Sequence, residues 1–314
     1  MVRYLDPKYD LTFKRVFAEH KNLCISLINS LLMFDGDKQI IEIEYQTNEL
    51  VPELPILKNS IVDVRCTDKT GRQFIVEMQM NWTESFKSRV LLNASKAYVI
   101  QLDTAKEIEL LKPVYSINLV NDKIDSSPEM ANEYYHYYKI VNIKHSDKQI
   151  KGLEFVFIEL PKFRPGNRAE QKLHDLWLRF LTEINENTKE VPAELLEDKD
   201  IREAIGYMHE ASFSKEDKLA YDQNKIDVLT ARSMLSSTRQ EGVDEGLKEG
   251  LKEGLKEGLK EGLKKGEAIG LQKGKLEGKI EGKIEIAKNL KTLGLSLEQI
   301  AKATDLTIEE IEKM

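Results

Sequence analysis

The chain has 314 residues, which suggests one or two domains, and a formal net charge of −7. Residues 1–165 carry 22 Lys and Arg against 23 Asp and Glu, so the chain lacks the strong basic excess of a DNA-coating protein, although a local basic rim can hide inside a neutral total. No charged leader or long apolar run is present, so we expect a cytoplasmic protein without a membrane span. Cys24 and Cys66 are predicted to be reduced, structural thiols.

Hydrophobic periodicity predicts a mixed α/β core in the first part of the chain. Helical spacing covers residues 8–18, 21–33 and 84–103. Strand-like runs cover residues 39–46, 61–67, 73–80, 113–120, 137–143 and 153–160. Asp68-Lys69-Thr70-Gly71 is a good turn sequence, so residues 61–80 are predicted to form a hairpin. The expected fold is a mixed sheet flanked by helices, followed by an α-helical region.

Composition divides the chain into four predicted parts. Pro161 and Pro165 end the α/β domain, which is assigned to residues 1–165. A helical subdomain follows, then a tract with glycine at every fourth position, then a small tail that resembles a helix-turn-helix. Glutamates in the last helix disfavour DNA reading by this tail and favour capping or docking. The bounds of the last three parts are 166–240, 241–284 and 285–314.

Eleven glycines recur at every fourth position from Gly242 to Gly282. Each glycine inside a helix costs about 1 kcal/mol relative to alanine, so the tract is predicted to be disordered or to be helical by packing on another chain. Leucines such as Leu247 and Leu251 run beside the glycines and supply apolar contacts. We expect a homo-oligomer through this tract, with a solvated linker and a docking site for another protein as alternatives. The charges in every turn exclude a membrane helix.

The candidate chemistry lies in the predicted hairpin. Glu77 and Gln79 are two residues apart on one strand and so share a face, and Asp63 falls at the same end of the partner strand. Two carboxylates and an amide oxygen are ligands suited to Mg²⁺ or Mn²⁺. Such an ion can activate water and stabilise a phosphodiester transition state. The alternative is a set of polar residues on the solvent face of a sheet.

Other enzyme classes find little support in the chain. The five histidines show no zinc-ligand spacing, no serine has the setting of a nucleophile elbow, and no glycine-rich phosphate loop follows a strand. These absences disfavour a zinc enzyme, a triad hydrolase and a P-loop enzyme.

Asp63, then Glu77-x-Gln79, followed by the helix over 84–103, resembles the PD-(D/E)xK nuclease superfamily. The segment from Asp10 to Phe17 and the glutamate-glycine repeats are similar to its Rpn branch, the recombination-promoting nucleases also described as transposases. The resemblance implies that residues 1–165 are a nuclease domain, with metal on Asp63 and Glu77 and DNA as substrate. It also implies a role in recombination, mobile elements or phage defence.

The chain departs from the superfamily pattern at two positions. No proline precedes Asp63, and Gln79 replaces the usual lysine, although the branch commonly has this glutamine. Lys14 or Lys96 could supply the missing positive charge, and Lys14 is preferred because it lies in the matching N-terminal motif. Asp10 is a supporting carboxylate or a helix N-cap.

Further expectations concern Tyr98, the activity of the protein and its regulation. Tyr98 either stacks near the site or packs in the core. The resemblance implies a Mg²⁺-dependent DNA endonuclease in which Gln79 holds a metal-bound water or the substrate. The rival hypothesis is a catalytically decayed nuclease fold that works as an oligomeric scaffold. An internal start at Met234 would yield an oligomerising C-terminal fragment that regulates the nuclease.

Overall fold

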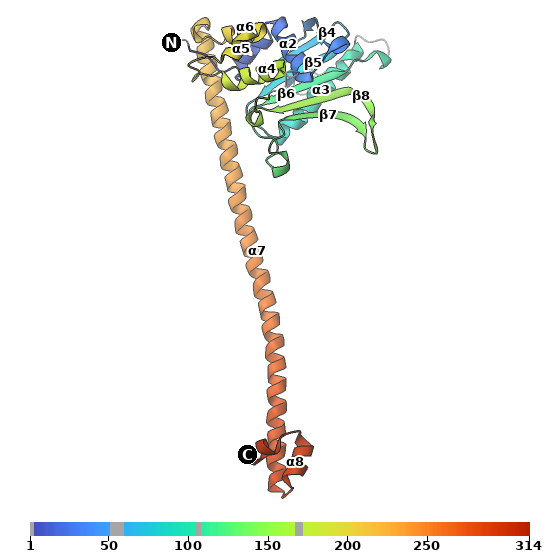
Figure 1. Cartoon of the computed structure of the whole chain (residues 1–314), viewed down its shortest axis with the longest axis vertical. Helices are drawn as coiled ribbons and strands as arrows, with labels where there is room; N and C mark the ends of the chain where they lie inside the picture. The colour runs from blue at the N-terminus through green and yellow to red at the C-terminus, as the bar shows by residue number, and fades with distance from the viewer. Residues whose placement is uncertain (1–2, 51–59, 104–107, 167–171) are drawn as a thin grey trace. The chain divides into compact units, whose positions relative to one another are not determined.

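A six-stranded mixed sheet forms the centre of the first part of the chain (Figure 1). The computed structural model describes residues 3–50, 60–103, 108–166 and 172–314, and the chain divides into two units, residues 1–234 and 235–314. In the sheet, β5, β6 and β8 run parallel to one another and the other neighbours pair antiparallel. The strand order is β1 (Ile43–Tyr45), β4 (Val64–Asp68), β5 (Gln73–Gln79), β6 (Val114–Val120), β8 (His145–Glu159) and β7 (Tyr135–Asn142), and β2 (Glu49–Leu50) pairs separately with β3 (Ser60–Ile61).

Helices cover both faces of this sheet, as expected for the mixed α/β fold that the sequence predicts. One face packs on helices through a large core that includes Phe74 and Val76 of β5. The helices of that core are α1 (Asp10–Phe17), α2 (Lys21–Leu32), α4 (Lys172–Glu183), α5 (Ala193–Glu197) and α6 (Lys199–Tyr207). The other face packs on α3 (Glu84–Val99) through two smaller clusters that include Ile75. Short 3-10 turns cover Gly36–Lys38, Ile100–Asp103, Ile108–Leu110, Pro128–Met130, Leu160–Lys162 and Glu210–Ser212.

Helices α4, α5 and α6 share the core of the sheet. Trp177 is fully buried, donates its indole N–H to the Ser26 hydroxyl at 3.1 Å, and stacks edge-on against Phe17. Ile201 and Met208 are buried in the same cluster. The described helices between residues 172 and 213 therefore pack in the same core as the sheet.

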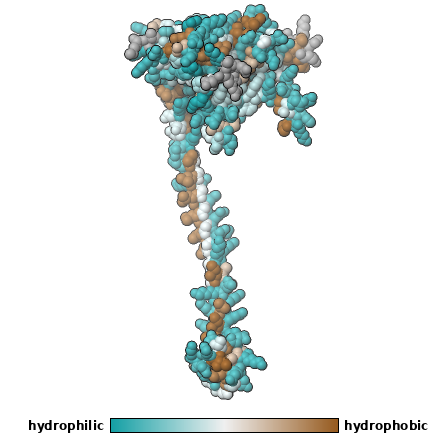
Figure 2. Space-filling model, in the orientation of Figure 1, coloured by the Kyte–Doolittle hydropathy of each residue, from teal (hydrophilic) through white to brown (hydrophobic). Residues whose placement is uncertain are grey.

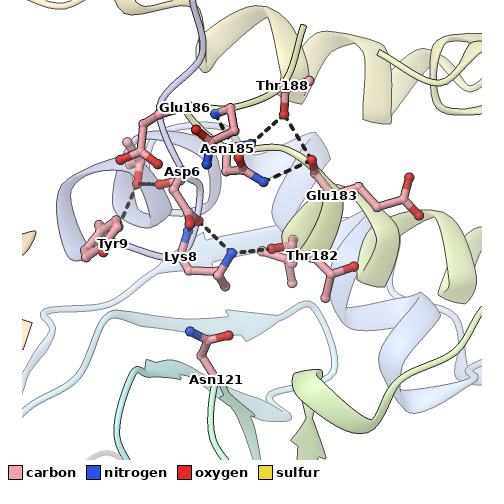
Figure 3. A network of polar contacts seen from close by, with 12 residues as sticks. Asp6, Lys8, Tyr9, Asn121, Thr182, Glu183, Asn185, Glu186 and Thr188 are labelled. Atoms are coloured by element: carbon pink, nitrogen blue, oxygen red, sulfur yellow. Dashed lines mark hydrogen bonds and ion pairs between the residues drawn. The ribbon is translucent and has the colours of Figure 1, made fainter. Parts of the chain in front are cut away.

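A polar network joins the N-terminal segment around Asp6 and Lys8 to the end of α4 (Figure 3). The first turns of α7 (Lys215–Thr292) contact this network through Tyr221. The Tyr221 hydroxyl accepts from the Asp6 amide at 3.0 Å and donates to Glu186 at 2.7 Å. Lys8 lies 2.9 Å from the Asp6 carboxylate and donates to the backbone carbonyl of Leu181 at 2.9 Å. Burial raises the pKa of Asp6, although the charge of Lys8 lowers it. The network therefore contains a buried pair of ionisable side chains, Asp6 and Lys8. The start of α7 is therefore part of the first unit.

The glycine tract is helical throughout, within the 78 residues of α7. Its leucines are exposed, with exposed fractions between 61% and 74%. Nothing lies within 4 Å of the positions that a Cβ would take on the glycines. Figure 2 shows the apolar residues as a brown stripe that runs beside the pale glycines. The stripe consists of Leu247, Leu251, Leu255, Leu259 and Leu263, and we call it the leucine stripe.

Two short capped helices pack on the end of α7. In α8 (Leu297–Thr304) and α9 (Ile308–Glu312), Ser296 and Thr307 form capping boxes with the residues three positions later. Asp305 between them is left-handed, with φ 53°, which is the predicted break. Ala287, Ile300 and Ile311 are buried together, so this tail has a small core. Within the described residues, no helix is both long enough and apolar enough to cross a membrane.

Candidate active site

The β4–β5 hairpin is closed by the turn at residues 68–71. The Asp68 carboxylate accepts from the Thr70 and Arg72 amides at 2.9 Å each, and Gly71 adopts φ 86°, which favours glycine. From this turn the strands pair in a register that ends with Val64 opposite Val76. Asp63 and Glu77 occupy the next position on each chain, so the turn sequence sets them side by side.

Asp63 lies at a bend, not inside a strand. Sequence periodicity predicts a strand over 61–67, but β4 begins at Val64. The reason is that the Asp63 Oδ2 accepts from the Met78 amide at 2.7 Å, so a side-chain oxygen replaces a backbone carbonyl at this point of the hairpin. The Asp63 carbonyl in turn accepts from the Asn48 side chain at 3.0 Å. These two contacts hold the carboxylate against β5.

Glu77 is buried on the sheet face that α3 covers, with an exposed fraction of 6%. Its Oε1 accepts from the Asn93 side-chain amide of α3 at 3.0 Å. The oxygen of that amide, Asn93 Oδ1, is buried without a hydrogen-bond partner among the described residues. Such an orphaned acceptor beside a carboxylate is costly unless a donor reaches it. No sequence motif points to Asn93, which comes to Glu77 only through the packing of α3 on the sheet.

Both carboxylates titrate above their ordinary range. Burial is the main cause in each case, and it raises the pKa of Asp63 to about 6 and that of Glu77 to about 7. The charge of Asp63 also raises the pKa of Glu77, which shows that the two groups repel each other. Paired, buried and mutually repelling carboxylates are the setting in which a bound cation gains most. We call Asp63 and Glu77 the acid pair.

Gln79 is engaged at both ends of its amide. Its Nε2 donates to the Asn81 carbonyl at 2.7 Å, and its Oε1 accepts from the Arg89 guanidinium at 2.9 Å. Arg89 lies on α3, and its charge lowers the pKa of both members of the acid pair. The glutamine that stands in the place of the motif lysine thus holds an arginine beside the acid pair.

Lys14 and Asp10 also act on the acid pair. They form an ion pair at 2.6 Å one turn apart on α1. The charge of Lys14 lowers the pKa of Asp63 and Glu77, whereas that of Asp10 raises the pKa of Asp63. Asp10 is the first helical residue, and Tyr9 is the N-cap, so the prediction of Asp10 as an N-cap is displaced by one residue. The cations with the largest effect on the acid pair are Arg89 and Lys14, rather than Lys96.

Tyr98 lies with a packing cluster. Its ring packs against a group that includes Val62, Ile75 and Ala94, and it meets the backbone of Gly152. These contacts belong to the alternative in which Tyr98 is a core residue. They do not involve the acid pair.

The start of α7 reaches the same end of the sheet. Arg232 donates from Nε to the Asn81 side-chain oxygen at 3.1 Å, and from Nη2 to the carbonyls of Met80 and Asn121 at 3.4 and 3.3 Å. The Asn81 amide donates to the Val228 carbonyl at 3.3 Å. Because Asn81 also accepts from Gln79, a line of hydrogen bonds runs from α7 to Arg89. We call this line the Arg232–Arg89 relay.

The donor set fits a hard divalent cation held by few protein ligands. Within the described parts of the chain, no three His, Cys, Asp or Glu side chains are grouped to hold a metal ion. The acid pair offers two carboxylates, and the orphaned Asn93 Oδ1 offers an acceptor for a metal-bound water. Mg²⁺ commonly uses one or two carboxylates and keeps several waters, so two protein carboxylates suffice for it.

Comparison with known proteins assigns the chain to a family. The family model for the PD-(D/E)XK nuclease family transposase matches residues 7–237, which span the sheet, its helices and the start of α7. No curated protein and no solved structure matches the chain. The match covers most of the chain and includes the acid pair, and the mixed sheet flanked by helices is consistent with the fold. The chain belongs to the PD-(D/E)XK nuclease family transposases, a family of phosphodiester-cleaving hydrolases.

Proposed function

We propose that this protein is a metal-dependent DNA endonuclease of the Rpn type, with Mg²⁺ or Mn²⁺ held by Asp63 and Glu77. The observation that carries the proposal is the acid pair itself. Two carboxylates lie at adjacent positions of a hairpin, and burial together with mutual repulsion keeps the pKa of Glu77 at about 7. A divalent cation bound there would lower the pKa of a water and offset charge on the phosphodiester.

The chain's own residues have separable roles in this proposal. Asn93 fixes the orientation of the Glu77 carboxylate through its amide hydrogen bond. Arg89 and Lys14 stabilise negative charge that develops on the phosphate, because both already act on the acid pair. Gln79 positions Arg89 instead of holding a metal-bound water, since both ends of its amide are engaged. Hydrolysis would leave a 3′-hydroxyl and a 5′-phosphate.

We further propose that the leucine stripe joins copies of the chain, so that two active sites act on the two strands of a duplex. Exposed leucines alongside glycines that have open space support close approach of a second helix. A fragment that starts at Met234 would contain all of the second unit and lack Arg232, so it would join the oligomer without an active site. Such a fragment would regulate the nuclease, and the cellular role would be recombination, mobile-element activity or phage defence.

The test is cleavage of supercoiled plasmid by the purified full chain. We expect nicking and linearisation in Mg²⁺ or Mn²⁺, and none in EDTA. Asp63→Asn should abolish cleavage, whereas Glu44→Gln, an exposed glutamate on β1, should cleave like the wild type. A folded wild-type protein that does not cut in either metal would contradict the proposal and favour the scaffold alternative. Cleavage that survives Asp63→Asn would place the active site elsewhere.

A further inference from the structure

Strands β7 and β8 continue beyond the sheet as a two-stranded ribbon. Leu153 is the first residue of β8 that pairs with β6, so residues 145–152 pair only with β7. Every residue from 139 to 151 is exposed, including Ile143 at 98% and Ile150 at 71%. An isolated two-stranded ribbon is marginally stable in water, so this one gains from a partner. We call residues 139–151 the β7–β8 arm.

The base of the arm is firmly attached to the first unit. The register shifts between Lys139 and Ile140, which marks a bulge where the ribbon leaves the sheet. Gly152 lies at this point with φ 152°, and the Tyr98 ring lies 3.4 Å from the position of a Cβ there. Tyr138 packs edge-on against Phe157 at 5.8 Å between ring centroids. These contacts fix the direction in which the arm leaves the sheet.

The arm is basic, although the chain as a whole is acidic. It contains Lys139, Lys144, Lys148 and Lys151 but only one acidic residue, Asp147, whereas the full chain has a net charge of −7. Lys139 pairs with Glu154 at 3.6 Å and Lys148 pairs with Asp147 at 3.4 Å. Lys144 and Lys151 form no ion pair with any residue that the structure describes. The arm is therefore a local basic surface within residues 1–165, whose total charge is close to neutral.

A ribbon with these charges suits a duplex nucleic acid. The major groove of DNA admits a two-stranded ribbon, and lysines along it neutralise phosphates on either side. The nearest arm residue on β8, Lys151, lies six residues along and two strands across from the register position of Glu77, which corresponds to about 22 Å at ordinary strand spacings. Its tip lies roughly 20 Å further out if the ribbon runs straight. A duplex cut at Glu77 would therefore meet the arm within about one helical turn.

We propose that the β7–β8 arm is a DNA-binding surface that holds the duplex about one helical turn from the acid pair. This deepens the proposed function and depends on DNA being the substrate. The arm lysines contribute affinity without sequence preference, because phosphate contacts position a duplex but do not read its bases. A second copy of the chain, docked through the exposed isoleucines of the arm, is the competing occupant.

The test is binding of a fluorescein-labelled 30-base-pair duplex by the full chain in EDTA, measured by anisotropy across a salt series. The variant Lys144→Gln, Lys148→Gln, Lys151→Gln should bind at least tenfold more weakly, with the salt slope reduced by about 3. The matched control removes the same charge from the glycine tract. It carries Lys248→Gln, Lys252→Gln and Lys256→Gln and should bind like the wild type.

Several outcomes would overturn the proposal. Equal affinity of the arm variant and the wild type, or equal weakening by the arm and tract variants, would show that the arm has no specific part in binding. Unchanged DNA affinity together with a smaller sedimenting mass would assign the arm to contacts between copies. Failure of the wild-type chain to bind the duplex would also contradict the proposal that the arm binds DNA.

Cleavage separates this proposal from the proposed function. If the arm variant loses affinity while the wild type binds but never cuts, the arm stands as a DNA surface and the nuclease proposal fails. If the nuclease is active, the arm variant should cut an 8-base-pair duplex as fast as the wild type does, because such a duplex, cut near its middle, extends only about 14 Å from the cut and does not reach the arm. It should cut the 30-base-pair duplex more slowly at low protein concentration. Equal impairment on both lengths would contradict the proposed position of the arm.

Discussion

The first unit and the glycine tract differ in which side chains lie in an unfavourable environment. In the described part of residues 1–234 a large apolar core is buried, and the unusual groups within it are polar: the acid pair, the orphaned Asn93 oxygen and the buried Asp6–Lys8 pair. In the tract the charged side chains are exposed to solvent, as is usual, but the leucine stripe is also exposed along its length, which is unusual for apolar side chains. Buried polar groups without full compensation indicate a site for a cation or substrate. An exposed apolar stripe indicates a partner chain.

The largest expected effect comes from neutralising the acid pair. Glu77→Gln should lower plasmid cleavage by on the order of 10³-fold or more, because it removes one of two metal-binding charges. In EDTA at pH 8 the same variant should be more stable than the wild type. Burial makes the charged form of Glu77 unfavourable, so removing that charge relieves a cost.

The sign of this stability effect follows from the raised pKa. Folding raises the pKa of Glu77 from 4.5 to about 7, so between these values the folded chain holds a proton that the unfolded chain has lost. Stability due to this group is therefore highest below about pH 4.5 and falls as the pH rises towards 7. The difference is on the order of 3 kcal/mol. Thermal unfolding at pH 4.5 and pH 8 measures it, and a Glu77→Gln midpoint no higher than that of the wild type at pH 8 would contradict the account.

The next effect concerns the two cations. Arg89→Gln should reduce cleavage by about 10- to 100-fold, and Lys14→Gln by a similar or smaller factor, because each charge is near the acid pair. Loss of Arg89 also removes a charge that lowers the pKa of Glu77. The acid limb of the pH–rate profile should therefore move to higher pH. Lys87→Gln, on the same helix beside an apolar pocket, is the control, and an equal loss in that variant would argue for general charge effects.

A smaller effect is expected from the Arg232–Arg89 relay. Arg232→Gln should lower cleavage about 3- to 10-fold, because Asn81 and Gln79 would no longer be held and Arg89 would be less well positioned. The loss should appear in kcat rather than KM, and it should be absent in an Arg89→Gln background. Arg239→Gln, an exposed arginine further along α7, provides the comparison. Additive losses in the double variant would show that Arg232 does not act through Arg89.

The smallest effect on chemistry should come from the leucine stripe, although its effect on assembly should be large. Leu251→Lys, Leu255→Lys and Leu259→Lys together should reduce the sedimenting mass to that of one chain. Nicking per chain should stay within about twofold, while linearisation should fall relative to nicking. Lys252→Gln, Lys256→Gln and Lys260→Gln should leave the mass unchanged. A wild-type protein that sediments as a single chain would contradict the proposal that the exposed leucine stripe joins copies of the chain.

Much of the fold could be predicted because its signals are local. β-branched and aromatic runs predicted β5, β6, β7 and the second half of β8, from residue 153 on, and the Asp68–Gly71 turn set the register of the hairpin. That register is also why the positions of Asp63 and Glu77 could be related from sequence alone. The two short helices of the tail could be predicted for the same reason, because Ser296 and Thr307 cap them through local hydrogen bonds.

The remaining features depend on contacts between distant segments. Asn93 and Arg89 meet β5 only because α3 crosses the sheet at a particular rotation, which periodicity does not specify. Arg232 lies 151 residues from Asn81 in sequence, so no local pattern relates them. The departure of β4 from the predicted strand has a similar origin, because a side chain at Asp63 replaces a backbone acceptor.

The most direct test of the central claim is calorimetric titration of the full chain with Mn²⁺ at pH 7.5. The acid pair should bind one Mn²⁺ per chain, with proton release because Glu77 is partly protonated at that pH. Asp63→Asn and Glu77→Gln should each abolish this binding, whereas Glu44→Gln should retain it. Mn²⁺ binding that is unchanged in both acid-pair variants would contradict the account, as would a folded wild-type chain that binds no Mn²⁺.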